Sequence, residues 1–203
     1  MTDPRARPLD ERDLDPDPLR QFGRWFEAAA ELPLREAMAL ATAARDGRPS
    51  ARMVLLKGAD EQGFAFYTGY ESRKADELAE NAHAALLFYW HTFGRQVRIE
   101  GSVERVPGEE SAAYFATRPR QAQLAAWASA QSRPLASREE LEARVAELER
   151  EFEARDVPLP AHWGGYRLVP DAYEFWQHRE NRLHDRFRYT RAREGWRIER
   201  LGP

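Results

Sequence analysis

The chain has 203 residues, with 31 basic and 34 acidic side chains and a formal net charge of −3. One domain is expected at this length, and the acidic balance argues against nucleic acid or an anionic membrane as a partner. The absence of cysteine from the sequence excludes disulfides, thiolate metal sites, iron–sulfur clusters and cysteine nucleophiles.

The first residues, MTDPRARPLDERDLDPDP, are polar and rich in proline. We expect residues 1–16 to form a flexible arm and residues 17–203 to form a single domain. This segment has neither the apolar core of a signal peptide nor the character of a transit peptide. The longest apolar run, residues 84–90, is far shorter than the ~20 residues of a membrane span, so we expect a cytoplasmic protein.

Helix signals and strand signals alternate in the first half of the chain. Asp17 and Pro18 supply an N-cap and a first-turn proline, which predicts a helix through about residue 30. Ser72 is expected to cap a second, short helix. Strand-like segments lie over residues 37–44, 51–57, 63–68, 83–90 and 95–106.

In the second half, short helices are expected over residues 108–117 and 120–130, and a capping box at residues 137–140 opens a longer surface helix that packs on the barrel. Strand-like segments follow over residues 166–170, 172–177, 181–191 and 195–201. Strands dominate and no βαβ rhythm is present. The predicted fold class is therefore α+β, with an antiparallel sheet closed into a barrel and peripheral helices.

The segment NRLHDRFRYTR, residues 181–191, concentrates basic residues in a chain that is acidic overall. On a regular strand, Arg182, His184, Arg186 and Arg188 would share one face. Like charges two residues apart repel each other, so the arrangement needs a reason. The segment is compatible with a nucleic-acid stripe, a solvated sheet face or the wall of an anion site.

Several catalytic classes lack their motifs in this sequence. The histidines do not show the HExxH or a similar metal spacing, so no metal is expected, and neither a G-x-S-x-G elbow nor a phosphate-binding glycine loop is present. The doublet His184-Asp185 also occurs in metal-dependent phosphohydrolases, but there it lies on helices with further histidines. We therefore set a metal-dependent reaction aside.

Cationic and hydroxyl groups remain as the candidate chemistry. Ser72-Arg73-Lys74 opens a helix, whose free N–H groups and dipole favour an anion, although such charges often only face solvent. Among the 31 basic residues only Lys57 and Lys74 are lysine, a hint that a compact ammonium is needed at those positions. Two separate cationic groupings suggest two small phosphorylated ligands. Trp176 is either an aromatic wall for one of them or a core residue.

A set of segments spread from about Asp13 to the C-terminus resembles the pyridoxine/pyridoxamine 5′-phosphate oxidase family. They are RMVLLK (52–57), FYT (66–68), SRKA (72–75), LLFYWHTFGRQVRIEG (86–101), YFATRPR (114–120), WASAQS (127–132), PLPAHWGGYRL (158–168), EFW (174–176), RLHDRFRY (182–189) and WRIERL (196–201). The combination of RLHDR, RQV and SRK is specific to this family.

The resemblance implies a split β-barrel homodimer with FMN bound at the subunit interface. It also implies oxidation of pyridoxamine or pyridoxine 5′-phosphate to pyridoxal 5′-phosphate, with oxygen reduced to hydrogen peroxide. Carried over by motif, the cofactor contacts are Arg52, Met53, Val54, Leu55, Leu56, Lys57, Tyr67, Thr68, Arg73, Lys74, Gln96, Gln131, Ser132, Trp176 and Arg186. The substrate contacts are Lys57, Tyr114, Arg118, Arg182, Leu183 and His184, of which Arg182 and His184 are the candidate catalytic residues.

Two departures from the family pattern bear on the substrate. The family usually has a serine four residues after the substrate-binding arginine, whereas this chain has Ala122. The family's longer N-terminal arm, which carries a lid segment in some members, is shortened here to MTDPRARP. Two alternatives stay open: a related FMN oxidase acting on another ring, as in phenazine pathways, and a non-catalytic flavin or pyridoxal-phosphate carrier.

Overall fold

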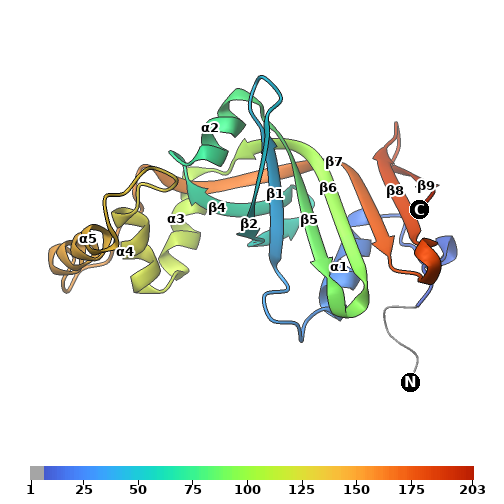
Figure 1. The fold of residues 1–203 in the computed structure, drawn as a ribbon, viewed down its shortest axis with the longest axis horizontal. Coiled ribbons are helices and arrows are strands. Elements are labelled where there is room, and N and C mark those ends of the chain that lie inside the picture. The colour runs from blue at the N-terminus through green and yellow to red at the C-terminus, as the bar shows by residue number, and fades with distance from the viewer. Residues whose placement is uncertain (1–6) are drawn as a thin grey trace.

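A computed structural model describes residues 7–203, which form a curled antiparallel sheet with helices around it (Figure 1). The strands are β1 (Ala37–Ala43), β2 (Pro49–Leu55), β3 (Gly58–Asp60), β4 (Gly63–Gly69), β5 (His83–Trp90), β6 (Arg95–Arg105), β7 (Trp163–Gln177), β8 (Asp185–Arg191) and β9 (Trp196–Arg200). The helices are α1 (Pro18–Ala28), α2 (Arg73–Glu80), α3 (Gly108–Thr117), α4 (Arg120–Ala128) and α5 (Arg138–Glu151).

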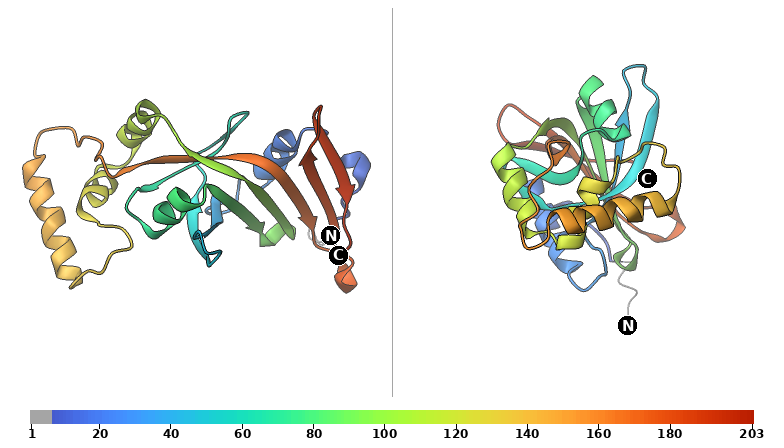
Figure 2. Two further views of the ribbon diagram at one scale, coloured as in Figure 1. Left: turned by 90° about the horizontal axis from the view of Figure 1, so that it is seen from above. Right: turned by 90° about the vertical axis from the view of Figure 1, so that its left-hand side faces the viewer.

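The sheet follows the order β2-β1-β5-β6-β7-β4-β3, with β8 and β9 added beside β7. The strand pairings among residues 7–203 are all antiparallel, which confirms the predicted α+β class with an antiparallel barrel-like sheet. Figure 2 shows how strongly the sheet curls along its length.

Strand β7 organises the molecule because it pairs with three other strands. Its first part, residues 163–168, pairs with β4, its last part, residues 172–177, pairs with β8, and its other edge pairs with β6. The sequence predicted two strands here, and the structure has one. A register shift between Glu100 and Gly101 of β6 accommodates the bend, and a Cβ at Gly101 would lie only 2.0 Å from the Val169 carbonyl oxygen.

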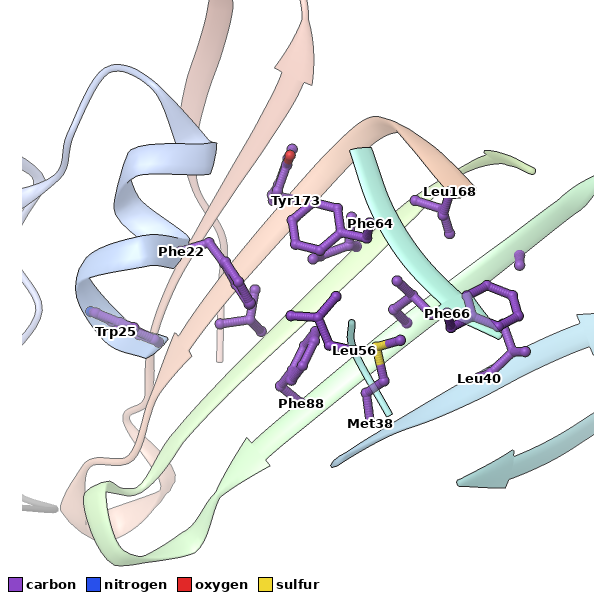
Figure 3. Close-up of a cluster of buried hydrophobic side chains, with 14 of the residues drawn as sticks. Phe22, Trp25, Met38, Leu40, Leu56, Phe64, Phe66, Phe88, Leu168 and Tyr173 are labelled. Atoms are coloured by element: carbon purple, nitrogen blue, oxygen red, sulfur yellow. The ribbon is translucent and has the colours of Figure 1, made fainter. Parts of the chain in front are cut away.

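The barrel core is aromatic and is closed at one end by α1 (Figure 3). Phe22 of this helix meets Phe64 at 5.0 Å and Phe88 at 5.1 Å between ring centroids. As predicted, Asp17 caps the helix, because its side chain accepts a hydrogen bond from the Leu19 N–H. The apolar stripe of α1 therefore seals the core.

Residues 7–16 differ from the flexible arm expected over residues 1–16. Leu9 is buried and its N–H donates to Asp185 at 3.2 Å, while the Asp15 carbonyl oxygen accepts from the Tyr189 hydroxyl at 2.8 Å. These contacts attach the segment to β8, because an apolar side chain and two buried polar groups find partners there. The rest of the expected arm, residues 1–6, lies outside the described residues.

Helices α3, α4 and α5 form an extension beyond the barrel (Figure 2). A second apolar cluster, comprising Phe115, Leu124, Phe152, Val157 and Trp163, joins them to the start of β7. Helix α5 packs on α4 and lies at the far end of the extension, whereas the sequence placed it against the barrel. Among residues 7–203, no helix is long and apolar enough to cross a membrane.

Candidate functional site

A cavity of about 670 Å³ lies between β2, β4, the start of α2 and the extension. We call it the cationic cavity. It brings together most of the residues predicted from the sequence: Arg52, Met53, Val54, Leu55, Lys57, Tyr67, Thr68, Arg73, Lys74, Tyr114, Arg118, Gln131 and Ser132. These residues come from segments up to eighty positions apart in the chain, so the fold itself creates the basic character of the cavity.

One end of the cationic cavity is formed by β2 and the first turn of α2. Arg52 lies 3.2 Å from a Glu77 carboxylate oxygen, and Arg73 donates to the same carboxylate at 2.9 Å. Ser72 precedes the helix as predicted, but its hydroxyl donates to the Gly69 carbonyl and caps no helix N–H. The first N–H groups of α2 therefore stay available to an anion beside two guanidinium groups.

Lys74 is the buried cation of this end. Its side chain is 6% exposed, and its ammonium donates to the hydroxyls of Thr68 at 2.9 Å and Ser72 at 3.1 Å. Burial, together with the positive charge of Arg52, lowers the pKa of Lys74 to about 8. An ammonium with only neutral partners is the arrangement expected beneath an anion.

Another part of the cavity wall is aromatic and carries a further cation. Tyr67 stacks on Tyr114 at 4.0 Å between ring centroids and on Trp163 at 5.6 Å. The Arg118 guanidinium lies 4.6 Å from the centre of the Trp163 ring, and its Nη1 is buried without a hydrogen-bond partner among the described residues. Burial also lowers the pKa of Arg118. This orphaned donor fits an anionic ligand at a distance from the Arg52 end.

The loop after α4 completes the cavity wall. The Gln131 side-chain oxygen accepts from the Thr68 hydroxyl at 2.8 Å and from the Gly69 N–H at 3.0 Å. Ser132 follows with a φ of +70°, a left-handed conformation that turns the chain at the cavity edge. Gln131 therefore ties the loop to β4 and fixes the place of Ser132.

The remaining predicted residues lie elsewhere. Leu56 belongs to the barrel core. The others gather near β8, beyond the far end of β7, and we call them the β8 cluster: Gln96, Trp176, Arg182, Leu183, His184 and Arg186. None of them lines the cationic cavity.

The prediction that Arg182, His184, Arg186 and Arg188 share one strand face is wrong for the first two residues. Strand β8 begins at Asp185, and Arg182 ends a short 3₁₀ turn with a φ of +61°. Leu183 is 67% exposed. The left-handed backbone at Arg182 breaks the alternation that a strand requires, and sequence periodicity does not reveal such a turn.

Contacts within the β8 cluster hold its aromatic and basic groups together. Trp176 lies opposite Gln96 in β6 and opposite Arg186 in β8, and its ring centroid is 4.5 Å from that of His184. Arg186 is anchored by the buried carboxylate of Glu174 at 2.8 Å. The cluster is thus ordered even though it lies outside the cavity.

His184 has a defined hydrogen-bonding role on one side of its ring. Its Nδ1 accepts from the Arg179 N–H at 3.1 Å. Burial, and next the charges of His178, Arg182 and Arg186, lower the pKa of His184. Both effects favour the neutral imidazole with its proton on Nε2.

No group of three or more histidine, aspartate or glutamate residues within residues 7–203 is arranged to hold a metal ion. Two cavity features escaped the sequence reasoning. Trp163 belongs to the quoted segment PLPAHWGGYRL but was not singled out, and Glu77 resembles a solvated helix residue. The two glycines of that segment were the sequence signal for Trp163, because glycine in a strand marks a place where another group approaches the backbone closely. A Cβ at Gly165 would come within 2.7 Å of the Tyr67 ring.

Comparisons with known proteins identify the family. A protein-family model described as pyridoxamine 5′-phosphate oxidase matches residues 26–151. A second family model, described as the pyridoxine 5′-phosphate oxidase C-terminal dimerisation region, matches residues 163–203. The chain belongs to the pyridoxine/pyridoxamine 5′-phosphate oxidase family. The resemblance noted in the sequence is thereby confirmed.

Relatives of that name align over nearly the whole chain. The protein from Rubrobacter xylanophilus is 63% identical over 197 residues, covering 96% of this chain and 91% of the relative. The protein from a Nostoc species is 54% identical over 198 residues, covering 96% and 92%.

Solved structures give the fold. PhzG from Burkholderia lata, described in complex with tetrahydrophenazine-1-carboxylic acid, superposes with a TM-score of 0.91 at 35% identity, covering 98% of this chain and 99% of that one. An FMN-binding protein of the family from Nostoc punctiforme gives a TM-score of 0.71 at 18% identity, covering 90% and 95%. The predicted split barrel is confirmed by this likeness.

Proposed function

We propose that this protein is an FMN-dependent oxidase of the cytoplasm, with residues 17–203 as its FMN-binding domain. It converts pyridoxamine or pyridoxine 5′-phosphate to pyridoxal 5′-phosphate, while oxygen is reduced to hydrogen peroxide. The observation that carries the proposal is a single cavity lined by two groups of cationic side chains, Arg52, Arg73 and Lys74 (the Arg52 end) and Arg118 against Trp163 (the Arg118 end). The close relatives carry the name of this activity.

The Arg52 end fits the phosphate of FMN. It offers two guanidinium groups, a buried ammonium that donates to the Thr68 and Ser72 hydroxyls, and the first N–H groups of α2. Thr68, Gln131 and Ser132 lie along the wall between this end and the aromatic stack, where hydroxyl and amide groups suit a polar ring edge. Met53, Val54 and Leu55 of β2 supply the facing wall.

The Arg118 end fits the phosphate of the substrate. Its guanidinium has a buried donor without a partner, and Tyr114 and Lys57 line the same cavity. Tyr114 is held by its stacking on Tyr67, so its hydroxyl needs little ordering on binding. Two phosphate anchors in one cavity orient two ligands relative to each other, which converts an encounter into a reactive arrangement.

The β8 cluster joins the site through a second copy of the chain. Trp163 lines the cavity and Trp176 belongs to the cluster, and their thirteen-residue separation along β7 corresponds to about 40 Å. A flavin bound in the cavity cannot reach the cluster of its own chain over that distance. In a two-fold symmetric dimer, each cluster can complete the partner's cavity.

Exposed apolar side chains support such a dimer. Leu34, Met53 and Tyr89 are each more than half exposed and line a surface cavity of about 450 Å³ on the outer side of β1, β2 and β5. Met53 also lines the cationic cavity, so a partner covering this face would meet the site directly. The C-terminal segment matches a dimerisation region, which agrees with the proposal.

In the proposed dimer, Arg182 and His184 lie against the substrate ring. The chemistry that a bound flavin supplies is acceptance of a hydride from the substrate carbon bearing the amine or alcohol, followed by electron transfer to oxygen. Arg182 holds the substrate on the side away from the cofactor. His184, neutral and carrying its proton on Nε2, donates a hydrogen bond and orients the reacting group.

Anaerobic reduction tests this function. Holoprotein mixed with pyridoxamine 5′-phosphate should lose its flavin absorbance, and readmitted oxygen should restore the absorbance and yield one hydrogen peroxide per substrate. Fast reduction by a reduced phenazine precursor, with none by pyridoxamine 5′-phosphate, would assign the chain to the phenazine type of oxidase. Binding without reduction by either compound would identify a carrier.

A further inference from the structure

Glu77 is not one of the residues that the proposed reaction uses. It is nevertheless the most heavily hydrogen-bonded carboxylate at the cationic cavity. It lies on α2 and is 5% exposed. One oxygen accepts from the hydroxyls of Thr42 and Ser50, each at 2.5 Å, and lies 3.2 Å from the Arg52 guanidinium. The other oxygen accepts from Arg73 at 2.9 Å.

These contacts keep the carboxylate ionised although it is buried. Burial acts to raise the pKa of Glu77, but hydrogen bonds from Ser50, Thr42, Arg73 and Arg52 lower it to about 2. Glu77 is therefore negatively charged at neutral pH, directly behind the groups that face a phosphate. A negative charge in an anion site requires an explanation.

The two arginines supply that explanation. The Arg73 side chain is 65% exposed and that of Arg52 is 21% exposed. Long exposed side chains populate several rotamers, and binding must then remove that freedom. The shared carboxylate joins a residue of β2 to a residue of α2 and selects one arrangement for both guanidinium groups.

We propose that Glu77 is a positioning residue for the cofactor phosphate: its carboxylate holds Arg52 and Arg73 in their binding arrangement before the ligand arrives. This inference rests on the proposed function, since it takes the Arg52 end as the phosphate site of FMN. Glu77 itself touches neither ligand.

The negative charge of Glu77 also opposes a phosphate, so the two effects must be weighed. Two guanidinium groups lie within 3.2 Å of the carboxylate, and together with Lys74 they leave the end of the cavity net positive. Removing the carboxylate would free Arg73, would leave Arg52 held by the Leu40 carbonyl and the Thr42 and Ser50 hydroxyls, and would deprive those two hydroxyls of their acceptor. The orienting effect is therefore the larger one.

The test is titration of apoprotein with FMN and with riboflavin, which lacks the phosphate. Glu77→Gln keeps the size of the side chain but replaces one accepting oxygen with a donor. We expect its Kd for FMN to rise about tenfold and its Kd for riboflavin to stay within about twofold of the wild type. A general loss of stability would change both constants together.

Two further variants separate orientation from charge. Glu77→Asp keeps the charge on a side chain one methylene shorter, so we expect a similar loss that is specific to FMN. Glu80→Gln removes the same charge from an exposed position on α2, where Glu80 accepts from the Arg45 N–H, and should leave both constants unchanged. Glu77→Asp also covers the case in which Glu77→Gln fails to fold.

The inference is overturned if Glu77→Asp binds FMN like the wild type, if Glu77→Gln binds FMN more tightly, or if both ligands weaken equally. A wild-type protein that binds FMN no better than riboflavin would instead contradict the proposed function and, with it, this inference. The wild-type titration alone thus distinguishes the two failures.

Discussion

The cationic cavity and the β8 cluster both contain basic and aromatic side chains. Within one chain, the fold gathers the first group around a cavity but leaves the second group outside it. Arg52, Lys74 and Arg118 converge on one enclosed space from distant segments of the chain. Trp176 and Arg186 are equally well ordered by their neighbours but lie at the other end of β7. In the proposed dimer, these two groups are the halves of one site that meet only between two copies of the chain.

The cavity is built around buried, satisfied anchors, whereas the cluster presents its reactive groups outward. Lys74 and Gln131 are fixed by short hydrogen bonds inside the barrel wall. Arg182 is exposed and follows Asn181 in a left-handed turn. In the proposed dimer, Arg182 would reach the cavity of the other copy, and the left-handed turn would project it from the surface.

The largest loss of activity is expected for one variant in the cationic cavity and one in the β8 cluster. Arg118→Leu and Arg182→Leu should each lower kcat/KM for pyridoxamine 5′-phosphate by roughly 10- to 150-fold, because each removes a charge-assisted contact of about 1.5–3 kcal/mol. FMN should stay bound to both. Steady-state kinetics and the flavin content of the purified protein provide the measurements.

Coexpression of these two variants tests whether the halves belong to different copies. Half of the dimers are then mixed, and each mixed dimer contains one site free of both substitutions, so roughly a quarter of the wild-type activity should return. Were both halves supplied by one chain, every site would carry a substitution and no activity would return. Either variant expressed alone is the control.

Arg186→Leu should have a smaller effect than Arg118→Leu or Arg182→Leu, and the effect should be on FMN binding. Arg186 is paired with Glu174 next to Trp176, a position that suits the cofactor more than the substrate. We expect its FMN affinity to fall at least about tenfold, with much of the activity restored by excess FMN. Arg188→Leu, on the same strand and 43% exposed, should behave as the wild type. Loss of FMN from Arg182→Leu but not from Arg186→Leu would reverse the two assignments.

The pH dependence of FMN affinity depends on Lys74. Burial and the charge of Arg52 lower its pKa to about 8, whereas a bound phosphate would favour the ammonium and raise this pKa. Binding therefore takes up a proton above pH 8, and FMN affinity should fall by up to about tenfold per pH unit there. Below pH 8 the affinity should be nearly constant. Fluorescence titration between pH 7 and 9.5 measures both ranges.

Lys74→Arg is the matched variant for this dependence. A guanidinium stays protonated throughout the range, so the decrease above pH 8 should disappear even if the affinity itself is lower. An equal decrease in the variant would assign the titration to another group.

Local signals in the sequence predicted the elements well. Strand β5 occupies residues 83–90 and α3 occupies residues 108–117, the ranges expected from pattern alone. The N-cap of the predicted capping box was also confirmed, since the Ser137 hydroxyl accepts from the Glu140 N–H, but the Glu140 carboxylate accepts from the Ala136 N–H, one residue before the cap. Alternation and capping depend on neighbouring residues, so one chain suffices to recognise them.

Features that depend on tertiary pairing were missed. Glu77 lies among charged residues of a short helix, and only the approach of α2 to β1 and β2 buries it beneath Arg52. Likewise, the alternation around Arg182 suggested a strand, but the backbone turns there. The family motifs named residues of both the cationic cavity and the β8 cluster, although they carried no information about the distance between the two.

The smallest expected effect concerns Ala122, where the family usually has a serine. Ala122 is half-buried on the first turn of α4, close in sequence to Arg118, and it does not line the cationic cavity. A serine hydroxyl there adds one hydrogen bond to the substrate phosphate, of about 0.5–1.5 kcal/mol. Ala122→Ser should therefore lower KM roughly two- to tenfold and leave kcat and FMN affinity unchanged.

Ala113→Ser, at an exposed position on α3, is the control for this change and should have no effect on KM. An unchanged KM in Ala122→Ser would mean that Arg118, Tyr114 and Lys57 already satisfy the phosphate oxygens. A raised KM would mean that the added hydroxyl crowds the first turn of α4, where the Ala122 N–H donates to the Pro119 carbonyl at 2.8 Å. Because Arg118 precedes this turn, such crowding would displace its guanidinium and be detectable as weaker binding of inorganic phosphate.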